Sequence, residues 1–231
     1  MERAVIITAG GSGLRMGSEI PKQFLTINGV PLLVYTLKQF AEDESLKLRI
    51  VLVLPEIQSS YWLSLVEKYG VDSSGYEIVF GGPSRGQSIR NGLNHLADLA
   101  DDALIAVHDG VRPFAGQILT GLCFAEAEKF GNAVPVVAIR DSMRAVKSNG
   151  SESVNRENFV AVQTPQVFRH SQLKAAYSPE FFDEASDDAT LVERAGFKIH
   201  TVPGHHYNFK VTFPPDFAMA EWVVKNKLGE L

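Results

Sequence analysis

Cysteine is almost absent from this chain: Cys123 is the single cysteine in 231 residues, so no disulfide can form within the chain. A lone thiol is typical of a reducing compartment, and we expect a cytoplasmic protein. Long apolar runs are missing too, since none approaches the roughly 20 residues that a membrane helix needs. The first residues are strand-like rather than basic and then apolar, so we expect no signal peptide and no membrane association.

An excess of positive charge is also missing. The chain has 22 lysines and arginines against 27 aspartates and glutamates, which gives a formal net charge of −5. This balance argues against a general nucleic-acid-binding protein, and we expect no nucleic-acid partner. If the substrates are polyanions, the cations that attract them must be concentrated in one cleft. Beyond one adjacent pair, the six histidines show no metal-ligand spacing, so we expect no zinc site.

Strand-like and helix-like patterns alternate along the first 139 residues. Such alternation predicts an α/β fold in which a mostly parallel sheet has helices on both faces. The length fits a single domain over residues 1–231, and ligands of such sheets bind beyond the carboxyl ends of the strands. Apolar runs typical of buried strands occur at 4–9, 48–54, 77–80, 103–108 and 133–139, and helical patterns at 31–41, 57–69, 84–99 and 115–130.

Residues 141–157 break this alternation. The segment is polar and centres on Ser148-Asn149-Gly150-Ser151, in which Asn-Gly strongly favours a β-hairpin. Arg140, Arg144 and Arg156 lie in or beside it, which is unusual for a surface hairpin with no further role. Because a two-stranded arm is marginally stable alone in water, we expect this protruding β-arm to rest on another subunit.

A glycine loop follows the first apolar run. The sequence Gly10-Gly11-Ser12-Gly13-Leu14-Arg15-Met16-Gly17 lets the backbone approach a ligand closely, and its N–H groups can hold phosphate. Arg15 and Lys22 add two cations, so we interpret the segment as a nucleoside triphosphate site. The loop lacks the Gly-Lys-Ser/Thr of a Walker A motif, and Met16 stands where the dinucleotide fingerprint needs glycine. A dinucleotide oxidoreductase and a purely structural turn are the alternatives.

Three further segments place polar side chains after predicted strands. In the segment 108–113, Asp109 supplies the carboxylate that Mg²⁺ prefers, although a simple ion pair with Arg112 is the alternative. The segment 81–88 can close over a base and ribose, although Ser84 there also suits a helix N-cap. In the segment 208–212, Lys210 follows a late strand, where a solvated surface lysine is the alternative.

Taken in order and spacing, these motifs resemble the 2-C-methyl-D-erythritol 4-phosphate cytidylyltransferases over essentially the whole chain. The resemblance implies a Rossmann-like nucleotidyltransferase fold, a requirement for Mg²⁺, and a homodimer whose extended arms embrace. The matching segments are 9–16, Pro21-Lys22-Gln23-Phe24, Gly81-Gly82 with Arg85 and Ser88, His108-Asp109 with Arg112-Pro113, Arg140-Asp141-Ser142-Met143, Arg156, Gln163-Thr164-Pro165-Gln166, Asp187-Asp188-Ala189-Thr190 and Lys210-Val211-Thr212.

The same resemblance implies a role for each matching residue. Asp109 would hold the metal, and Ser142 and Arg156 would reach the partner subunit's substrate from the arm. Two positions depart from the family. Ser142 stands where threonine is frequent, and it keeps the hydroxyl. Pro83 stands where an acidic residue is frequent, and it removes a backbone N–H and a carboxylate. The implied catalytic residues are Arg15, Lys22, Arg156 and Lys210; the CTP-binding residues are Ala9, Gly10, Gly11, Gly13, Gly82, Arg85 and Ser88; and the residues that bind the polyol phosphate are Asp109, Arg112, Ser142 and Thr164.

The reaction that the resemblance implies is transfer of CMP from CTP to methylerythritol phosphate, with release of pyrophosphate. A phosphate monoester has a second pKa of about 6 and is mostly dianionic at neutral pH, so the nucleophile needs no general base. What the reaction needs is positioning and charge neutralisation. A ribitol-5-phosphate cytidylyltransferase is the nearest alternative. A non-catalytic nucleotide-binding regulator is another, although it would be expected to have lost a cation or the metal carboxylate.

Overall fold

The computed structural model describes residues 1–10, 20–43, 45–178 and 185–228, so Gly11, Gly13 and Arg15 lie outside the described residues. The strands are β1 (Arg3–Thr8), β2 (Thr26–Ile27), β3 (Val30–Pro31), β4 (Arg49–Leu54), β5 (Glu77–Phe80), β6 (Leu104–Asp109), β7 (Asn132–Ala138), β8 (Met143–Lys147), β9 (Gly150–Val154), β10 (Val160–Val162), β11 (Gln166–Arg169) and β12 (Thr201–Pro203). The α-helices are α1 (Leu32–Ala41), α2 (Ser59–Tyr69), α3 (Arg85–His95), α4 (Gly116–Phe130), α5 (His170–Ala176), α6 (Asp188–Arg194) and α7 (Pro214–Lys225).

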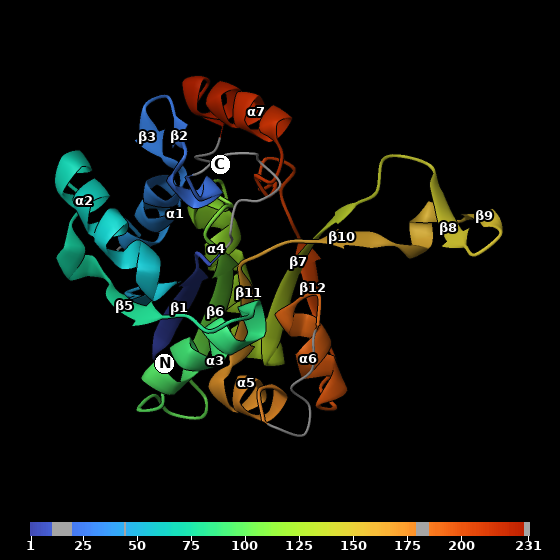
Figure 1. Ribbon diagram of the computed structural model, residues 1–231. Helices are drawn as coiled ribbons and strands as arrows, with labels where there is room; N and C mark the ends of the chain where they lie inside the picture. The colour runs from blue at the N-terminus through green and yellow to red at the C-terminus, as the bar shows by residue number, and fades with distance from the viewer. Residues whose placement is uncertain (11–19, 44, 179–184, 229–231) are drawn as a thin grey trace.

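One eight-stranded sheet forms the centre of the molecule, in the order β10-β7-β11-β6-β1-β4-β5, with β12 paired to β7 (Figure 1). β1 is parallel to β4 and β6, and β4 is parallel to β5. β11 is antiparallel to both β6 and β7, between which it lies, and β10 is antiparallel to β7. Six strands therefore run in one direction and two in the other, which confirms the predicted mostly parallel sheet.

Helices cover both faces of this sheet, as the alternation predicts. Along β1, Val5 and Ile7 contribute to the core beneath α1, α2 and α4, whereas Ala4 and Ile6 contribute to the core beneath α3, α5 and α6. All four side chains are fully buried. A third cluster joins α7 to the β2–β3 hairpin, and it includes Val111 and Val211 from the segments that carry site residues.

The nine elements predicted before residue 140 are all present, and α1 begins after Pro31 as expected. The largest difference in bounds is α3, which ends at His95 rather than at residue 99. Within the described residues, no helix combines the length and the apolar character needed to cross a membrane.

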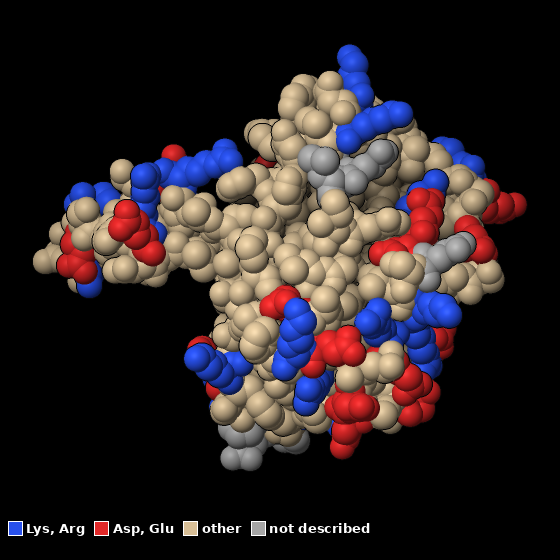
Figure 2. All heavy atoms as spheres, turned by 180° about the vertical axis from the view of Figure 1, so that it is seen from behind, with Lys and Arg blue, Asp and Glu red and all other residues tan. Residues whose placement is uncertain are grey.

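The predicted β-arm is present as the β8–β9 hairpin. Lys147 pairs with Gly150, which leaves Ser148 and Asn149 as the turn. The arm projects from the body and carries charged side chains of both signs (Figures 1 and 2). At its base Ala138 of β7 pairs with Val160 of β10, so the chain leaves and re-enters the sheet at the same place.

Candidate active site

Most of the predicted site residues that the structure describes gather at the carboxyl ends of β1 and β6, where the fold class expects a site. Asp109 is the last residue of β6 and pairs in register with Thr8 of β1. Two cavities adjoin there, of about 230 and 470 Å³, and Arg85, Asp109 and Lys210 line both. The smaller cavity is also lined by Ala9, Gly10, Lys22, Gly82 and Ser88, and the larger by Arg112, Gln163, Thr164 and Asp187.

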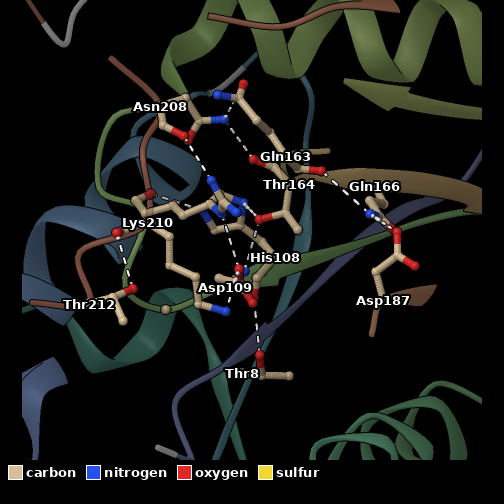
Figure 3. Close-up of polar contacts among 12 residues, drawn as sticks. Thr8, His108, Asp109, Gln163, Thr164, Gln166, Asp187, Asn208, Lys210 and Thr212 are labelled. Carbon is tan, nitrogen blue, oxygen red and sulfur yellow. Dashed lines mark hydrogen bonds and ion pairs between the residues drawn. The ribbon is translucent and has the colours of Figure 1, made fainter. Parts of the chain in front are cut away.

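Three cations surround the Asp109 carboxylate, and Figure 3 shows Lys210 beside it. Its Oδ2 lies 3.0 Å from Nε of Arg112 and 3.1 Å from Nζ of Lys210, and its Oδ1 lies 3.9 Å from Nε of Arg85. Burial alone would raise the pKa of this carboxyl, but the charges of Lys210, Arg112 and Arg85 lower it well below its usual range. The group is therefore ionised at neutral pH. The structure contains the Asp109–Arg112 ion pair, and Lys210 is ion-paired rather than merely solvated.

Hydrogen bonds within and between the segments 109–112 and 208–211 hold the charged groups of Asp109, Arg112 and Lys210 in place. The N–H of Arg112 donates to the carbonyl of Asp109 at 3.0 Å, which closes a turn over residues 109–112. Arg112 Nη1 donates to the carbonyl of Asn208 at 2.9 Å, and the N–H of Val211 donates to the carbonyl of Val111 at 3.0 Å. The segment that carries Lys210 is thus bound along the turn.

His108 lies directly beneath this turn and is fully buried. Its Nε2 lies 2.9 Å from the carbonyl oxygen of Arg112, and its Nδ1 lies 3.1 Å from Oγ1 of Thr164 (Figure 3). Burial lowers the pKa of His108 to about 4, so the imidazole is neutral at physiological pH. Thr164 also accepts a hydrogen bond from the N–H of Asp109 at 3.1 Å. The predicted Thr164 therefore lines the cavity while its hydroxyl bonds to protein groups.

Arg85 reaches the site from the N-terminal turn of α3. Its Nη2 donates to Oδ2 of Asp188 at 2.7 Å, and Asp188, which is fully buried, also accepts from the hydroxyl of Tyr177. Asp187 caps α6 by accepting from the N–H of Thr190. Arg85 is thus tied to the segment 187–190 and lies between the two cavities.

The smaller cavity is built from backbone at the ends of β1 and β5. The N–H of Gly82 donates to Oγ of Ser88 at 3.1 Å, and a Cβ on Gly82 would lie 2.0 Å from Cγ of Gln87, so only glycine fits here. Ser84 accepts from the N–H of Gln87 and caps α3, which confirms the cap interpretation. Pro83 lines the cavity as well.

Arg156 and Ser142 lie elsewhere. Both are exposed near the base of the arm, and neither lines the two cavities of the described chain. Arg156 donates from Nη1 to the carbonyl of Arg140. The fold of one chain therefore brings Lys22, Arg85, Asp109, Arg112, Thr164 and Lys210 together, but not the two residues of the arm.

Asp109 is the carboxylate that this site offers to a metal, because it is the one acidic side chain among the described residues that line the smaller cavity. Among the described residues, no group of three or more His, Cys, Asp or Glu side chains could hold a metal ion. Mg²⁺ is commonly bound through one or two carboxylates with substrate phosphates completing the shell, and this requirement fits Asp109 beside a phosphate-sized cavity. Oδ1 is the better-placed oxygen, because Oδ2 already binds Arg112 and Lys210.

Several amide side chains, most of them buried, support the site without having been assigned a role from the sequence. Gln23 donates from Nε2 to the carbonyl of Ala9 at 2.7 Å and so fixes the end of β1. Asn208 donates to the carbonyl of Thr164 at 2.8 Å, and Gln163 binds both backbone groups of His205. Gln39 of α1 donates to the carbonyl of Arg112 at 3.0 Å. No local pattern marks these residues, since their partners lie 14 to 73 positions away.

A sheet whose strand ends carry clustered cations, an ionised carboxylate and two adjoining cavities, the smaller of which is lined by glycine backbone, defines an α/β enzyme that acts on phosphate esters. The family model described as 2-C-methyl-D-erythritol 4-phosphate cytidylyltransferase matches residues 3–226. The chain belongs to this family.

Individual relatives agree with this assignment. The 2-C-methyl-D-erythritol 4-phosphate cytidylyltransferase of Bacteroides fragilis is 42% identical over 220 residues, which cover 95% of this chain and 98% of that protein. The protein of the same name from Phocaeicola vulgatus is 41% identical and covers 97% of this chain and all of its own. The crystal structure of the Thermus thermophilus enzyme of this name superposes with a TM-score of 0.77 at 31% identity, over 97% of this chain and all of that chain.

Proposed function

We propose that this protein transfers CMP from CTP to 2-C-methyl-D-erythritol 4-phosphate and releases pyrophosphate. Family membership supports this activity. The observation that carries it in the structure is the position of Arg85, Asp109 and Lys210 on the wall shared by two adjoining cavities. Such a wall can present one phosphate ester to another.

CTP would occupy the smaller cavity, with its phosphates near Lys22 and the backbone of Ala9 and Gly10. The phosphate of the polyol would lie where the cavities meet, against Arg112 and Lys210. One of its oxygens forms a bond to the α-phosphorus of CTP. The bond from that phosphorus to the bridging oxygen breaks, and its electron pair leaves with pyrophosphate.

The chain's own groups supply what this step needs. The nucleophile is already an anion, so no group has to remove a proton from it. Lysine and arginine side chains neutralise negative charge as it shifts toward the leaving group, and fixed donors of this kind are effective because they need no rearrangement during the reaction. His108 is neutral and fully enclosed by protein, so it serves the architecture of the site rather than proton transfer.

We further propose that the reaction requires Mg²⁺, with Asp109 as the protein ligand and the phosphates of CTP as the remaining ligands. When bound, the metal would neutralise charge on the nucleotide phosphates.

We also propose that the protein is a homodimer. The β-arm exposes Val146 and the adjoining Phe159 and Val160, and it carries Arg156, which lies outside the site of its own chain. We propose a cytoplasmic location for the protein, because its proposed substrate is CTP and its single cysteine, Cys123, is a free, buried thiol.

A coupled assay of pyrophosphate release tests the activity. CTP is supplied with 2-C-methyl-D-erythritol 4-phosphate, with ribitol 5-phosphate, or with no acceptor, and each mixture is run with Mg²⁺ and with a chelator. We expect release only with methylerythritol phosphate and Mg²⁺. Release with ribitol phosphate alone would assign the alternative acceptor, and release with neither acceptor would remove the proposed function. Light scattering during size-exclusion chromatography tests the dimer.

A further inference from the structure

One buried imidazole, that of His108, bonds to both ends of the turn that carries Asp109 and Arg112. It contacts the carbonyl of Arg112 directly at 2.9 Å, and it contacts the N–H of Asp109 through the hydroxyl of Thr164. His108 thus links the two ends of the turn, although it lines neither cavity.

The directions of the three hydrogen bonds that join His108, Thr164 and the turn follow from the partners. A carbonyl oxygen can only accept, so Nε2 of His108 must carry a proton and donate to Arg112. In the neutral ring Nδ1 then carries none and accepts from the hydroxyl of Thr164. The same hydroxyl oxygen is left to accept from the N–H of Asp109. One tautomer satisfies all three contacts.

Helix α1 fixes the ring and the turn from the other side. Gln39 accepts at Oε1 from the N–H groups of Ala115 and Gly116, at 2.8 and 3.1 Å, which orients its amide. Its Nε2 therefore faces the carbonyl of Arg112 and donates a second hydrogen bond there at 3.0 Å. Phe40 packs edge-on against the imidazole, with ring centroids 4.9 Å apart.

We propose that His108, held in its Nε2–H tautomer, is a positioning residue that sets the orientation of the Asp109 carboxylate and the Arg112 guanidinium toward the polyol phosphate. The proposal rests on the proposed function for its kinetic readout. Replacing the imidazole would remove the contact at Arg112 or the contact at Thr164, and the corresponding end of the 109–112 turn would shift. A displacement of about 1 Å at a reacting centre can lower a rate about 100-fold.

Two substitutions separate the two contacts. In His108→Gln the amide nitrogen reaches the position of Nε2 and keeps a donor for Arg112, but nothing accepts from Thr164. In His108→Asn the amide oxygen lies near the position of Nδ1 and keeps the contact with Thr164, but the contact with Arg112 is lost. His170 provides the matched control, because it is equally buried and its Nδ1 contacts the carbonyl of Leu99 at 3.0 Å, at the opposite end of the sheet from the site.

Steady-state kinetics and thermal unfolding are measured for His108→Gln, His108→Asn and His170→Asn, with both substrates varied. We expect all three variants to lose thermal stability. Both His108 variants should lose about 10- to 100-fold in kcat/KM for methylerythritol phosphate, with the KM for CTP changed less than about threefold. His170→Asn should keep its kinetic constants. His108 variants that match His170→Asn in kinetics as well as in stability would overturn the proposal.

A second measurement does not depend on catalysis or on folded variants. The ¹⁵N chemical shifts of the imidazole in the wild-type protein distinguish a protonated Nε2 from a protonated Nδ1. The Nε2–H form is expected, and an Nδ1–H form or a mixture of tautomers would refute the assignment. If the wild-type protein is inactive in the assay of pyrophosphate release, only the proposed function is rejected. The ¹⁵N measurement still decides the tautomer of His108.

Discussion

Acid should destabilise the wild-type protein more than a His108→Gln variant. In the folded protein burial lowers the pKa of His108 to about 4, from an ordinary value of 6.5. As the pH falls below 6.5 the unfolded chain binds a proton at this side chain, whereas the folded chain does not. The stabilisation is therefore complete above about pH 6.5 and is lost progressively between pH 6.5 and pH 4.

The size of the effect follows from that interval. A difference of 2.5 pKa units, at 1.36 kcal/mol for each, corresponds to a loss of about 3 kcal/mol in the free energy of unfolding. This is a large part of the 5–15 kcal/mol typical of a folded protein. Asp109 does not contribute in this window. Its pKa lies below its usual range, so the stability that it adds is lost only at still lower pH.

Urea unfolding at several pH values between 7.5 and 4.5, followed by tryptophan fluorescence, measures the effect. Trp62 is fully buried between α2 and the core and should report the transition. The difference in unfolding free energy between wild type and His108→Gln is plotted against pH, which cancels the other titrating groups. We expect that difference to shrink by more than 2 kcal/mol toward pH 4.5. A difference that stays constant within about 0.5 kcal/mol would show that His108 titrates alike in both states, and the reasoning from its burial would be wrong.

Three further predictions concern the reaction. Lys22→Ala should lower kcat about 10²- to 10³-fold at saturating CTP and Mg²⁺ without a large change in Tm. Lys129→Ala, an exposed control on α4, should match wild type. An active Lys22→Ala enzyme would remove Lys22 from the catalytic set. Asp109→Asn should abolish turnover that depends on Mg²⁺, because an amide is a poor ligand for a hard dication, and an unchanged Mg²⁺ titration would place the metal elsewhere. Mixing inactive Lys22→Ala and Arg156→Ala subunits should restore about a quarter of the wild-type activity, since half of randomly paired dimers would hold one intact site. Verified exchange without recovery would assign Arg156 to its own subunit.

Local patterns in the sequence predicted nine of the elements before residue 140 and the β8–β9 hairpin, but not the short strands β2 and β3, because buried strands, amphipathic helices and Asn-Gly turns each depend on a few neighbouring residues. They did not predict that β11 (Gln166–Arg169) lies antiparallel between β6 and β7. Four residues carry too little periodicity to indicate a partner, and the choice depends on which sheet edge is open.

The site shows the same limit. Asp109, Arg112 and Lys210 could be predicted from their motifs, and the structure places one nitrogen of each cation within 3.1 Å of the Asp109 carboxylate. The support beneath them could not be predicted, because buried contacts such as His108–Thr164 and Gln39–Arg112 join residues 56 and 73 positions apart. Nor does one chain place Arg156 at its own cavities, so its predicted role still depends on the partner subunit.

The position of β11 has a consequence for the order in which the chain can fold. Every strand that pairs with β7, namely β10, β11 and β12, comes later in the sequence, so residues 132–138 have no neighbour in the sheet until residues 160–162 of β10 have been synthesised. By contrast, β1, β4, β5 and β6 can complete their mutual pairing from the first 109 residues. Hydrogen exchange on ribosome-bound chains that end before residue 160 should therefore show amides of 104–109 protected and those of 132–138 unprotected, and the reverse pattern would contradict this order. Insertion of β11 then joins the two halves of the sheet, and Thr164, two residues before it, reaches His108 only at that last step.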